Sequence, residues 1–451
     1  MPDLNQHLAA VIGAGPAGLF DARELAANGV KVILLNRDIK PGGLAEYGIY
    51  LDKYKMKNGL RAQFRQIVAM PEIDYYGNVL VSNGGDLTLN ALRELGVQAL
   101  LVTAGAQGTK WLGLPGERLK GVYHAKDIVY HYNLLPPYSQ QDFAIGHRVA
   151  LIGMGNVMTD IAHYLISILH VDDVVAIARR GPAEMKMDRK ELEAIAANLD
   201  LDLVDEEIDR AAQLMQVMGR DPTEHKAFLH AAVDRAQPTG SRTHFAMRFL
   251  LSPQKILGDD QGRVTGLVVE ENILVEENGV VRARGTGVQR TLDVDTIIFA
   301  IGDSADENLG LPVRNGEFIK SFTPRFPVDG LSYEVYDPAL RRLQEDVFLA
   351  GWARQAGMGV VGLARKDGTN GARAVMQYLQ TLTPQPPQTA QKVADYLRGC
   401  FPQLVDEAHL GVLIAAEQQR AADLGLPDFK YASNEEMFAV MGIEGVKLQA
   451  E

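Results

Sequence analysis

The chain has 451 residues, of which 47% are hydrophobic and 23% charged, and its formal net charge is −12 at pH 7. At roughly 100 to 200 residues per domain, this length predicts two or three domains of ordinary globular composition. The acidic total argues against a nucleic-acid partner, because phosphate binding needs a basic face. No apolar run of about 18 residues and no signal-peptide pattern is present, so we expect a cytoplasmic protein with no membrane partner.

A single cysteine, Cys400, rules out an internal disulfide and a cysteine-ligated iron–sulfur cluster within this chain. No metal-ligand spacing stands out either, so we expect no metal site. Any redox chemistry must therefore use a bound organic cofactor.

The first half of the chain begins with a strand–helix–strand pattern over residues 9–37, with Gly29 placed as a helix stop. A polar, glycine-rich passage over 41–58 follows, which we predict to be structureless and to touch a ligand. An apolar strand within 99–108 ends in a glycine-rich turn, where we expect the first crossing between domains.

A second strand–turn–helix–strand pattern covers residues 147–182. Residues 183–245 have a charged helical pattern, and 262–285 alternate apolar and polar residues as in antiparallel hairpins. Another buried strand is predicted within 296–304, then a strand, a glycine-rich turn and a helix over 346–375. The C-terminal tail is helical by its period.

The first turn reads VIGAGPAG and holds Gly13, Gly15 and Gly18 in G-x-G-x-x-G spacing between an apolar strand and a helix. This context predicts a dinucleotide whose pyrophosphate meets the helix N-terminus. The residue that closes the second strand is usually an acid that binds the adenosine ribose, but here it is Asn36. An amide can make the same contact without the charge.

The second turn has Gly153 and Gly155, with Met158 at the third glycine position, which predicts a looser turn. Arg179 and Arg180 follow the next strand, where an acid would bind a plain ribose. Guanidinium groups fit a phosphate, so this pair favours NADPH over NADH. We therefore expect FAD at the first turn, NADPH at the second, and electron transfer between them.

The ordered motifs VIGAGPAG, GGLAEYGI, YYGNVLV, LGLPGE, IGMGNVMTDIA, ARRGP, RFLLSPQKIL and VFLAGWARQAGMGVVG resemble the adrenodoxin-reductase-type ferredoxin–NADP⁺ reductases over almost the whole chain. GGLAEYGI also resembles, more distantly, the small subunit of bacterial glutamate synthase. The resemblance implies an α/β fold with two Rossmann-like dinucleotide-binding domains, the NADPH domain inserted into the FAD domain. The expected boundaries are 1–105 and 325–451 for FAD, with 106–324 for NADPH.

The resemblance also implies contact residues at matching positions. Those expected for FAD are Gly13, Gly15, Ala17, Gly18, Asn36, Leu44, Val81, Trp352, Gly359, Val360 and Val361. Those expected for NADPH are Gly155, Asn156, Val157, Arg179, Arg180 and Glu191, with Gly359 near the nicotinamide. Lys53, Asp160 and Glu191 are the candidate catalytic residues.

Several positions depart from the family pattern. Lys53 stands where bacterial members carry a histidine, and Ala194 replaces a second acid after Glu191. Hydride transfer needs aligned rings rather than a general acid, so we expect these changes to affect proton handling at the flavin. The alternative for Lys53 is an ordinary solvated loop lysine.

The partner is expected to be a ferredoxin or a similar small electron carrier. Leu251 replaces a basic residue of mitochondrial relatives, so an acidic carrier must find another patch. The candidates are Arg242, Arg248, Arg61, Arg65 and Lys57. Alternatives are a quinone or other small-molecule acceptor, an electron-input subunit of a larger complex, or a nucleotide-responsive binding protein without turnover.

Overall fold

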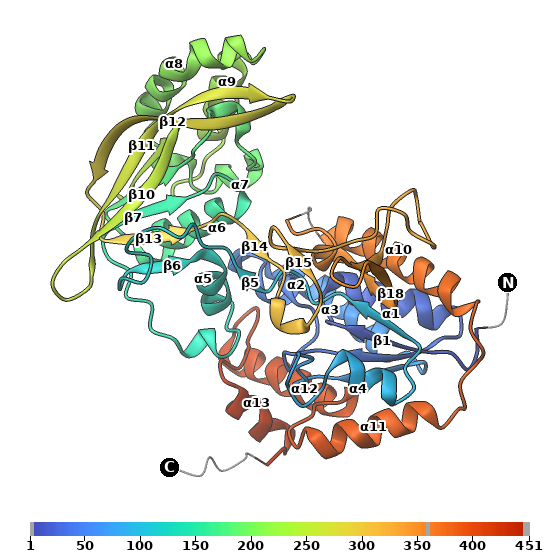
Figure 1. The fold of residues 1–451 in the computed structure, drawn as a ribbon. Helices are drawn as coiled ribbons and strands as arrows, with labels where there is room; N and C mark the ends of the chain where they lie inside the picture. The colour runs from blue at the N-terminus through green and yellow to red at the C-terminus, as the bar shows by residue number, and fades with distance from the viewer. Residues whose placement is uncertain (1–3, 358–360, 445–451) are drawn as a thin grey trace. The chain divides into compact units, whose positions relative to one another are not determined.

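The computed structural model describes residues 4–357 and 361–444 (Figure 1). The chain forms two compact units: the first contains 1–110, 130–140 and 302–451, and the second contains 111–129 and 141–301. The expected boundaries placed 302–324 in the inserted NADPH domain, whereas in the structure this segment belongs to the first unit. The reason is apolar packing, since Leu309, Leu311 and Phe318 are buried in a core of the first unit.

The first unit is built on a six-stranded sheet with the order β17-β18-β4-β1-β2-β3. The neighbours from β18 to β3 pair in parallel, and β17 is an antiparallel edge strand. The strands are β1 (Leu8–Ile12), β2 (Lys31–Leu35), β3 (Ile73–Tyr76), β4 (Ala99–Val102), β17 (Glu334–Asp337) and β18 (Arg342–Leu349).

Helices cover both faces of this sheet. Alternation along β1 sends Ala9 and Val11 into one core and Leu8, Ala10 and Ile12 into the other, as expected for a pleated strand. The first core also takes residues of α1 (Pro16–Ala27), α3 (Tyr54–Val68), α10 (Val361–Leu379), α12 (Glu407–Leu424) and α13 (Asn434–Met441). The second takes residues of α4 (Leu89–Glu94) and α11 (Thr389–Cys400).

Shorter elements complete the first unit. They include α2 (Leu44–Tyr47), β5 (Gly108–Thr109), β14 (Asp303–Ser304), β15 (Val313–Arg314) and β16 (Glu317–Phe318). The 3₁₀ turns are η1 (Leu51–Lys53), η2 (Tyr138–Gln140), η6 (Glu307–Leu309) and η7 (Gly351–Ala353). The prediction that 41–58 is structureless was wrong, because α2, η1 and the start of α3 occupy much of it.

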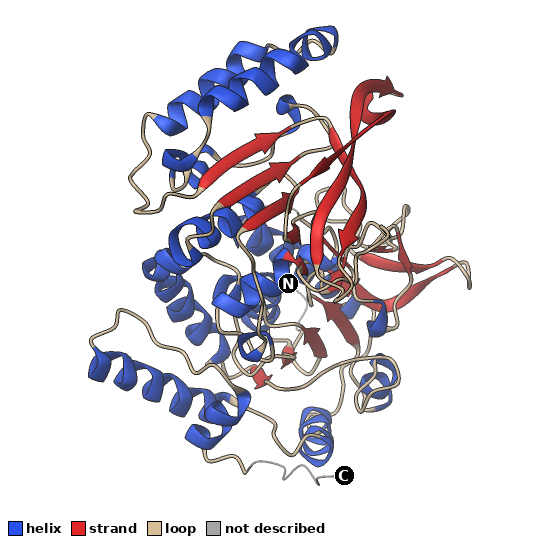
Figure 2. Ribbon diagram, turned by 90° about the vertical axis from the view of Figure 1, so that its left-hand side faces the viewer, coloured by secondary structure: helices blue, strands red, loops and turns tan. Residues whose placement is uncertain are grey.

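The second unit holds a five-stranded parallel sheet with the order β6-β13-β7-β8-β9 and a three-stranded antiparallel sheet, β10-β11-β12 (Figure 2). The parallel strands are β6 (Val122–His124), β7 (Arg148–Ile152), β8 (Asp173–Ile177), β9 (His244–Arg248) and β13 (Thr296–Phe299). The antiparallel strands are β10 (Leu251–Gly258), β11 (Val264–Glu277) and β12 (Val280–Leu292), which confirms the predicted hairpin.

The first helix of this unit belongs to the second strand–turn–helix pattern, and the later helices lie in the predicted charged stretch 183–245. They are α6 (Asn156–Tyr164), α7 (Arg189–Glu193), α8 (Leu201–Val217) and α9 (Pro222–Val233), with short turns η3 (Leu165–Leu169), η4 (Pro182–Glu184) and η5 (Ala196–Asn198). Helix α5 (Ala125–Tyr132) begins in this unit, and the chain then runs into 130–140 of the first. Among the described residues no helix is long and apolar enough to cross a membrane.

Candidate functional site: two dinucleotide turns

The first glycine-rich turn joins β1 to α1, and each glycine has a separate geometric role. Gly13 has a φ of +112°, and a Cβ there would lie 2.7 Å from the backbone of Ala104 beyond β4. Gly18 faces the carbonyl of Gly13 and the hydroxyl of Thr103 so closely that a Cβ would overlap both. At Gly15, in contrast, a Cβ would meet no atom within 4 Å. Gly13 and Gly18 therefore allow the turn to close tightly, and Gly15 leaves open space on the outside of the turn.

The glycine pair of GGL lies directly against this turn. The Gly42 N–H donates to the Ala14 carbonyl at 2.7 Å, and a Cβ on Gly43 would stand 3.0 Å from the Gly15 Cα. Leu44, a predicted FAD contact, begins α2 at this point. The loop thus borders the open side of the first turn.

Asn36 follows β2 and is buried. Its Oδ1 accepts from the Ala14 N–H at 3.1 Å, and its Nδ2 donates to the carbonyls of Asp38 and Lys40 at 2.8 and 2.9 Å. Nδ2 also donates to the Tyr75 hydroxyl at 3.3 Å. The amide therefore braces the turn from within the protein, and its expected ribose contact stays a prediction.

Trp352 lies in η7, which buried groups hold in place. Gly351 has a φ of +64°, and its N–H donates to Asp367 Oδ2 at 2.7 Å. Arg354 donates to Asp367 Oδ1 at 2.6 Å, and Tyr333 donates to the same oxygen at 3.1 Å. Asp367 thus fixes the loop that presents Trp352.

The other predicted FAD contacts are distributed along the first unit. Ala17 is buried in α1, Val81 is buried beside Leu87, and Val361 begins α10. Gly359 and Val360 lie outside the described residues, so their roles stay predictions.

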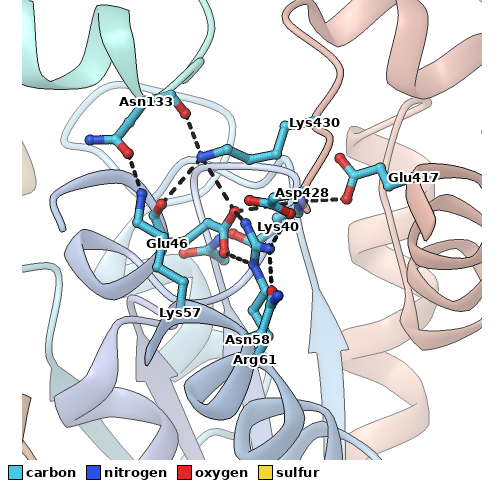
Figure 3. Close-up of polar contacts among 10 residues, drawn as sticks. Lys40, Glu46, Lys57, Asn58, Arg61, Asn133, Glu417, Asp428 and Lys430 are labelled. Atoms are coloured by element: carbon cyan, nitrogen blue, oxygen red, sulfur yellow. Dashed lines mark hydrogen bonds and ion pairs between the residues drawn. The ribbon is translucent and has the colours of Figure 1, made fainter. Parts of the chain in front are cut away.

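Helix α2 also carries Glu46, the centre of a buried polar cluster in the first unit (Figure 3). Arg61 on α3 binds both Glu46 carboxylate oxygens, at 2.6 and 2.7 Å. Lys40 and Lys430 each bring Nζ to 3.6 Å from Glu46 Oε1. The whole cluster consists of Lys40, Glu46, Lys57, Asn58, Arg61, Asn133, Glu417, Asp428 and Lys430.

The cluster shifts the pKa values of its buried members. Burial alone would raise the pKa of Glu46, but the charges of Lys40 and Lys430 and the hydrogen bonds from Arg61 hold it well below its usual value. Burial, aided by the charge of Lys430, lowers the pKa of Lys57 to about 7. Lys57 Nζ donates to Asn133 Oδ1 at 2.5 Å.

The prediction that Lys57 and Arg61 belong to an exposed basic patch was wrong. Lys57 is only 3% exposed, and Arg61 is tied to Glu46 and, at 2.7 Å, to Asp428. Arg61 braces α2 and the chain before α13, and Lys57 is bound to Asn133.

The second glycine-rich turn joins β7 to α6 in the second unit. Gly153 has a φ of +132°, and a Cβ there would overlap the carbonyl of Ala300 beyond β13. A Cβ on Gly155 would meet no atom within 4 Å. Met158, at the third glycine position, is fully buried. The second turn thus keeps one glycine where a side chain would clash and one glycine that faces open space. At the third glycine position it has the buried side chain of Met158.

Arg179 and Arg180 lie just beyond β8, and their backbone is held by the neighbouring sheet. The Arg179 carbonyl accepts from Asn272 Nδ2 at 2.9 Å, and the Arg180 carbonyl accepts from the Leu250 N–H at 3.1 Å. Within the described parts of the chain, neither guanidinium has an ion pair, and the Arg179 side chain is exposed. The fold therefore places both at the strand end where a second-nucleotide phosphate is expected.

The remaining predicted NADPH residues gather around α6 and α7. Asn156 Nδ2 donates to Asp188 Oδ2 at 2.7 Å, and its Oδ1 accepts from the Asp188 N–H at 2.7 Å. Val157 is 42% exposed on the first turn of α6. Asp160 lies further along α6, and Glu191 lies on α7, which packs against α6.

Lys53 belongs to the first unit, at the end of η1, and is half-buried. Gly155, the arginine pair and Glu191 on α7 all belong to the second unit.

Three positioning residues were not predicted from the sequence. Asp188 stands at the N-cap of α7, a signal that the preference for acids at helix starts could have revealed. Asp367 is an acid among mostly small and apolar buried residues of α10, and this break in the pattern could have marked it. Thr103, whose hydroxyl donates to the Gly13 carbonyl at 2.7 Å, gave no such signal.

The residues present fit a dinucleotide at each turn. Open space lies outside Gly15 and Gly155, and no side chain of the described chain caps α1 or α6. The first N–H groups of both helices are therefore oriented as a pyrophosphate site requires. Over the described ranges, no group of three His, Cys, Asp or Glu residues could hold a metal ion.

Comparison with known proteins agrees with this geometry. Residues 8–201 match the family model of the pyridine nucleotide-disulphide oxidoreductases. The NADPH-ferredoxin reductase FprA of Mycobacterium leprae is 28% identical over 473 residues, covering 96% of this chain and 98% of the relative. The human mitochondrial NADPH:adrenodoxin oxidoreductase is 26% identical over 472 residues, covering 96% and 91%.

A solved structure of Mycobacterium tuberculosis FprA in complex with NADPH superposes with a TM-score of 0.80 at 26% identity, covering 97% of this chain and 100% of that one. Both glycine-rich turns, the arginine pair and the nearly full-length similarity point the same way. Over nearly its whole length the chain is therefore similar to NADPH-dependent ferredoxin and adrenodoxin reductases.

Proposed function

We propose that this chain is an FAD-dependent oxidoreductase that takes a hydride from NADPH and passes the electrons singly to a ferredoxin-like carrier. The observation that carries the proposal is the arginine pair beyond β8, next to the open Gly155 turn. Both relatives described above are named for NADPH and a small iron–sulfur carrier. Their nearly full-length similarity supports the same activity here.

The cofactor supplies the change from two-electron to one-electron chemistry, because bound FAD accepts a hydride and can release electrons one at a time. One NADPH and two oxidised carriers give NADP⁺, two reduced carriers and one proton. The protein has to bind and align the two cofactors rather than donate a proton in the hydride step. We therefore propose that Lys53, Asp160 and Glu191 transfer protons or position the cofactors.

We assign the FAD site to the first unit and the NADPH site to the second. In the first unit, the N-terminus of α1 would hold the FAD pyrophosphate, while α2 and η7 would border the cofactor with Leu44 and Trp352. In the second, the N-terminus of α6 would hold the NADPH pyrophosphate. Arg179 and Arg180 would bind its 2′-phosphate with charge-assisted hydrogen bonds.

An anaerobic titration tests the proposal. We expect the purified protein to show flavin absorption that bleaches with NADPH and much less with NADH. A colourless protein that cannot be reconstituted with FAD, or equal bleaching by both nucleotides, would contradict it.

A second measurement separates the acceptors. The reduced protein is mixed with a small acidic [2Fe–2S] ferredoxin or with a neutral quinone such as menadione. We expect faster ferredoxin reduction at low ionic strength, because charged partners associate faster there. Reduction of the quinone alone would favour a small-molecule acceptor.

A further inference from the structure

A cation-rich groove lies along α1 and α10 in the first unit. It is an open cavity of about 430 Å³. Its lining residues are Arg23, Glu24, Asp329, Gly362, Arg365, Lys366, Thr369, Asn370 and Arg373. Four cations thus face two carboxylates, in a chain whose total charge is −12.

Two of the guanidinium groups share one aromatic ring. Arg23 and Arg365 place Cζ at 4.8 and 4.6 Å from the ring centroid of Phe20, which is almost fully buried. Cation–π contact with an immobile ring fixes the position of both heads. Both guanidinium groups lie within 5 Å of the same ring, so an anion near that ring would be attracted by two positive charges.

The groove offers little charge compensation of its own. Arg23, Arg365 and Lys366 form no ion pair with any described residue. Arg373 lies 3.9 Å from Glu24, a distance at the limit of an ion pair, and Asp329 accepts from Asn370 Nδ2 at 3.2 Å. The groove therefore keeps an excess of positive charge, with four cations against two carboxylates.

Three of the five basic residues predicted to bind the carrier are already paired, whereas the other two, Arg65 and Arg242, are exposed. Lys57 and Arg61 are committed to the cluster around Asn133 and Glu46, and Arg248 lies 3.0 Å from Glu207. Those three positions therefore contribute little free positive charge to a surface.

We infer that the groove along α1 and α10 is the docking surface for the acidic face of a protein one-electron carrier. This inference rests on the proposed function, from which the partner takes its electrons. The cations extend along α10 from Arg365 to Arg373, which is about 12 Å at 1.5 Å per residue. That length suits a row of carboxylates on a protein better than a single small anion.

Two further features favour an electron carrier. Leu363, next to Gly362, is 48% exposed and offers an apolar contact beside the charges, as protein interfaces do. The groove also begins one residue after Val361, a predicted FAD contact. A Cβ on Gly368 of the same helix would overlap the backbone of Ala17, another predicted contact. A carrier docked here would lie close to the proposed flavin.

A charge-reversal variant tests the surface. Arg365→Glu with Lys366→Glu changes the net charge by −4, and Arg314→Glu with Arg341→Glu makes the same change at exposed positions outside the groove. The probe is a small acidic [2Fe–2S] ferredoxin, and its Kd is measured by calorimetry with the holoenzyme. Its KM is measured in steady state at low salt and at about 0.1 M salt, where the Debye length is about 10 Å.

We expect the groove variant to raise both the Kd and the KM for ferredoxin at least about tenfold and to reduce their salt dependence. The control variant should change them by less than about threefold. Bleaching by NADPH and reduction of the neutral quinone should not change in either variant.

The inference is overturned if both variants weaken ferredoxin binding equally, or if pyrophosphate binds the groove tightly while ferredoxin binding ignores the substitutions. Failure of the wild-type protein to reduce ferredoxin, with normal bleaching by NADPH, would instead count against the proposed acceptor. The two failures are therefore distinguishable.

Discussion

The two glycine-rich turns have the same backbone plan and differ in how they are supported. In both, the first glycine has a left-handed φ and donates its N–H to the end of the next strand, to Leu35 at 2.8 Å and to Ile177 at 3.0 Å. In both, the second glycine faces open space. The difference begins at the third position, where Gly18 allows close backbone contact and Met158 fills the gap with a side chain.

The supports of the two turns differ as well. The first is enclosed by the GGL loop and by buried groups such as Asn36 and Glu46. The second is braced by half-buried Asn156 with exposed Asp188, and its arginine pair has no ion pair among the described residues. An enclosed turn suits a cofactor that stays bound, and an exposed turn suits a nucleotide that exchanges in every cycle.

Exchanging the residues at the third glycine position, Gly18 and Met158, should have the largest effect. In Gly18→Met, the side chain would overlap the Gly13 carbonyl and the Thr103 hydroxyl, so the turn cannot close. We expect loss of nearly all bound flavin, measured as the ratio of flavin to protein absorption.

The reciprocal change has a different cost. Met158→Gly would leave a buried void and a helical glycine, and should lower the free energy of unfolding by about 3–5 kcal/mol. The flavin content should stay normal, because the first turn is unchanged. A stable Met158→Gly protein would show that Met158 is not part of the core.

Replacing the arginine pair tests the second turn. Arg179→Ala with Arg180→Ala removes charge-assisted hydrogen bonds worth about 1.5–3 kcal/mol each. The KM for NADPH should rise about 100-fold or more, while the KM for NADH changes little. Arg282→Ala with Arg284→Ala on β12 is the matched control. Equal losses with both nucleotides would mean that the pair does not recognise the phosphate.

Replacing Asn36 tests the support of the first turn. Asn36→Asp supplies the acid that usually binds ribose, but it replaces donors to the carbonyls of Asp38 and Lys40 with acceptors. We expect weaker FAD binding and a loss of about 1–3 kcal/mol in unfolding free energy. Reconstitution titrations measure the FAD Kd, and Asn90→Asp makes the same charge change elsewhere. Tighter FAD binding would instead support the predicted ribose contact.

Lys57 gives the smallest effect, which depends on pH. Its folded pKa of about 7 is below the usual value, so between about pH 7 and pH 10 the unfolded chain binds more protons. This lysine therefore makes the protein more stable as pH rises through that range. The stability of Lys57→Met relative to wild type should fall by about 1 kcal/mol or more over the same interval, as measured by urea unfolding. Lys55→Met, exposed on the same helix, should show no such trend.

Much of the fold could be predicted because its signals are local. Both strand–turn–helix units, the hairpin of β11 and β12, and the C-terminal helices follow from period and glycine spacing. The return of 130–140 and 302–324 to the first unit could not be predicted, since it depends on which core buries residues such as Leu309.

The candidate site could also be predicted only in part. Gly13, Gly15 and the arginine pair could be identified from spacing alone. The cluster around Glu46 could not, because its members are spread from Lys40 to Lys430 and meet only after folding. The orientation of the Asn36 amide is likewise set by tertiary contacts that no local pattern encodes.

The segment 130–140 limits how the molecule can be dissected. Asn133 accepts hydrogen bonds from Lys57 and Lys430 of the first unit, although the chain on either side of this segment belongs to the second. Cutting out 111–301 as one fragment would remove the Asn133 acceptors of the Lys57 and Lys430 side chains. The two halves of this protein are therefore poor candidates for separate expression, and a split version would need this short segment grafted back.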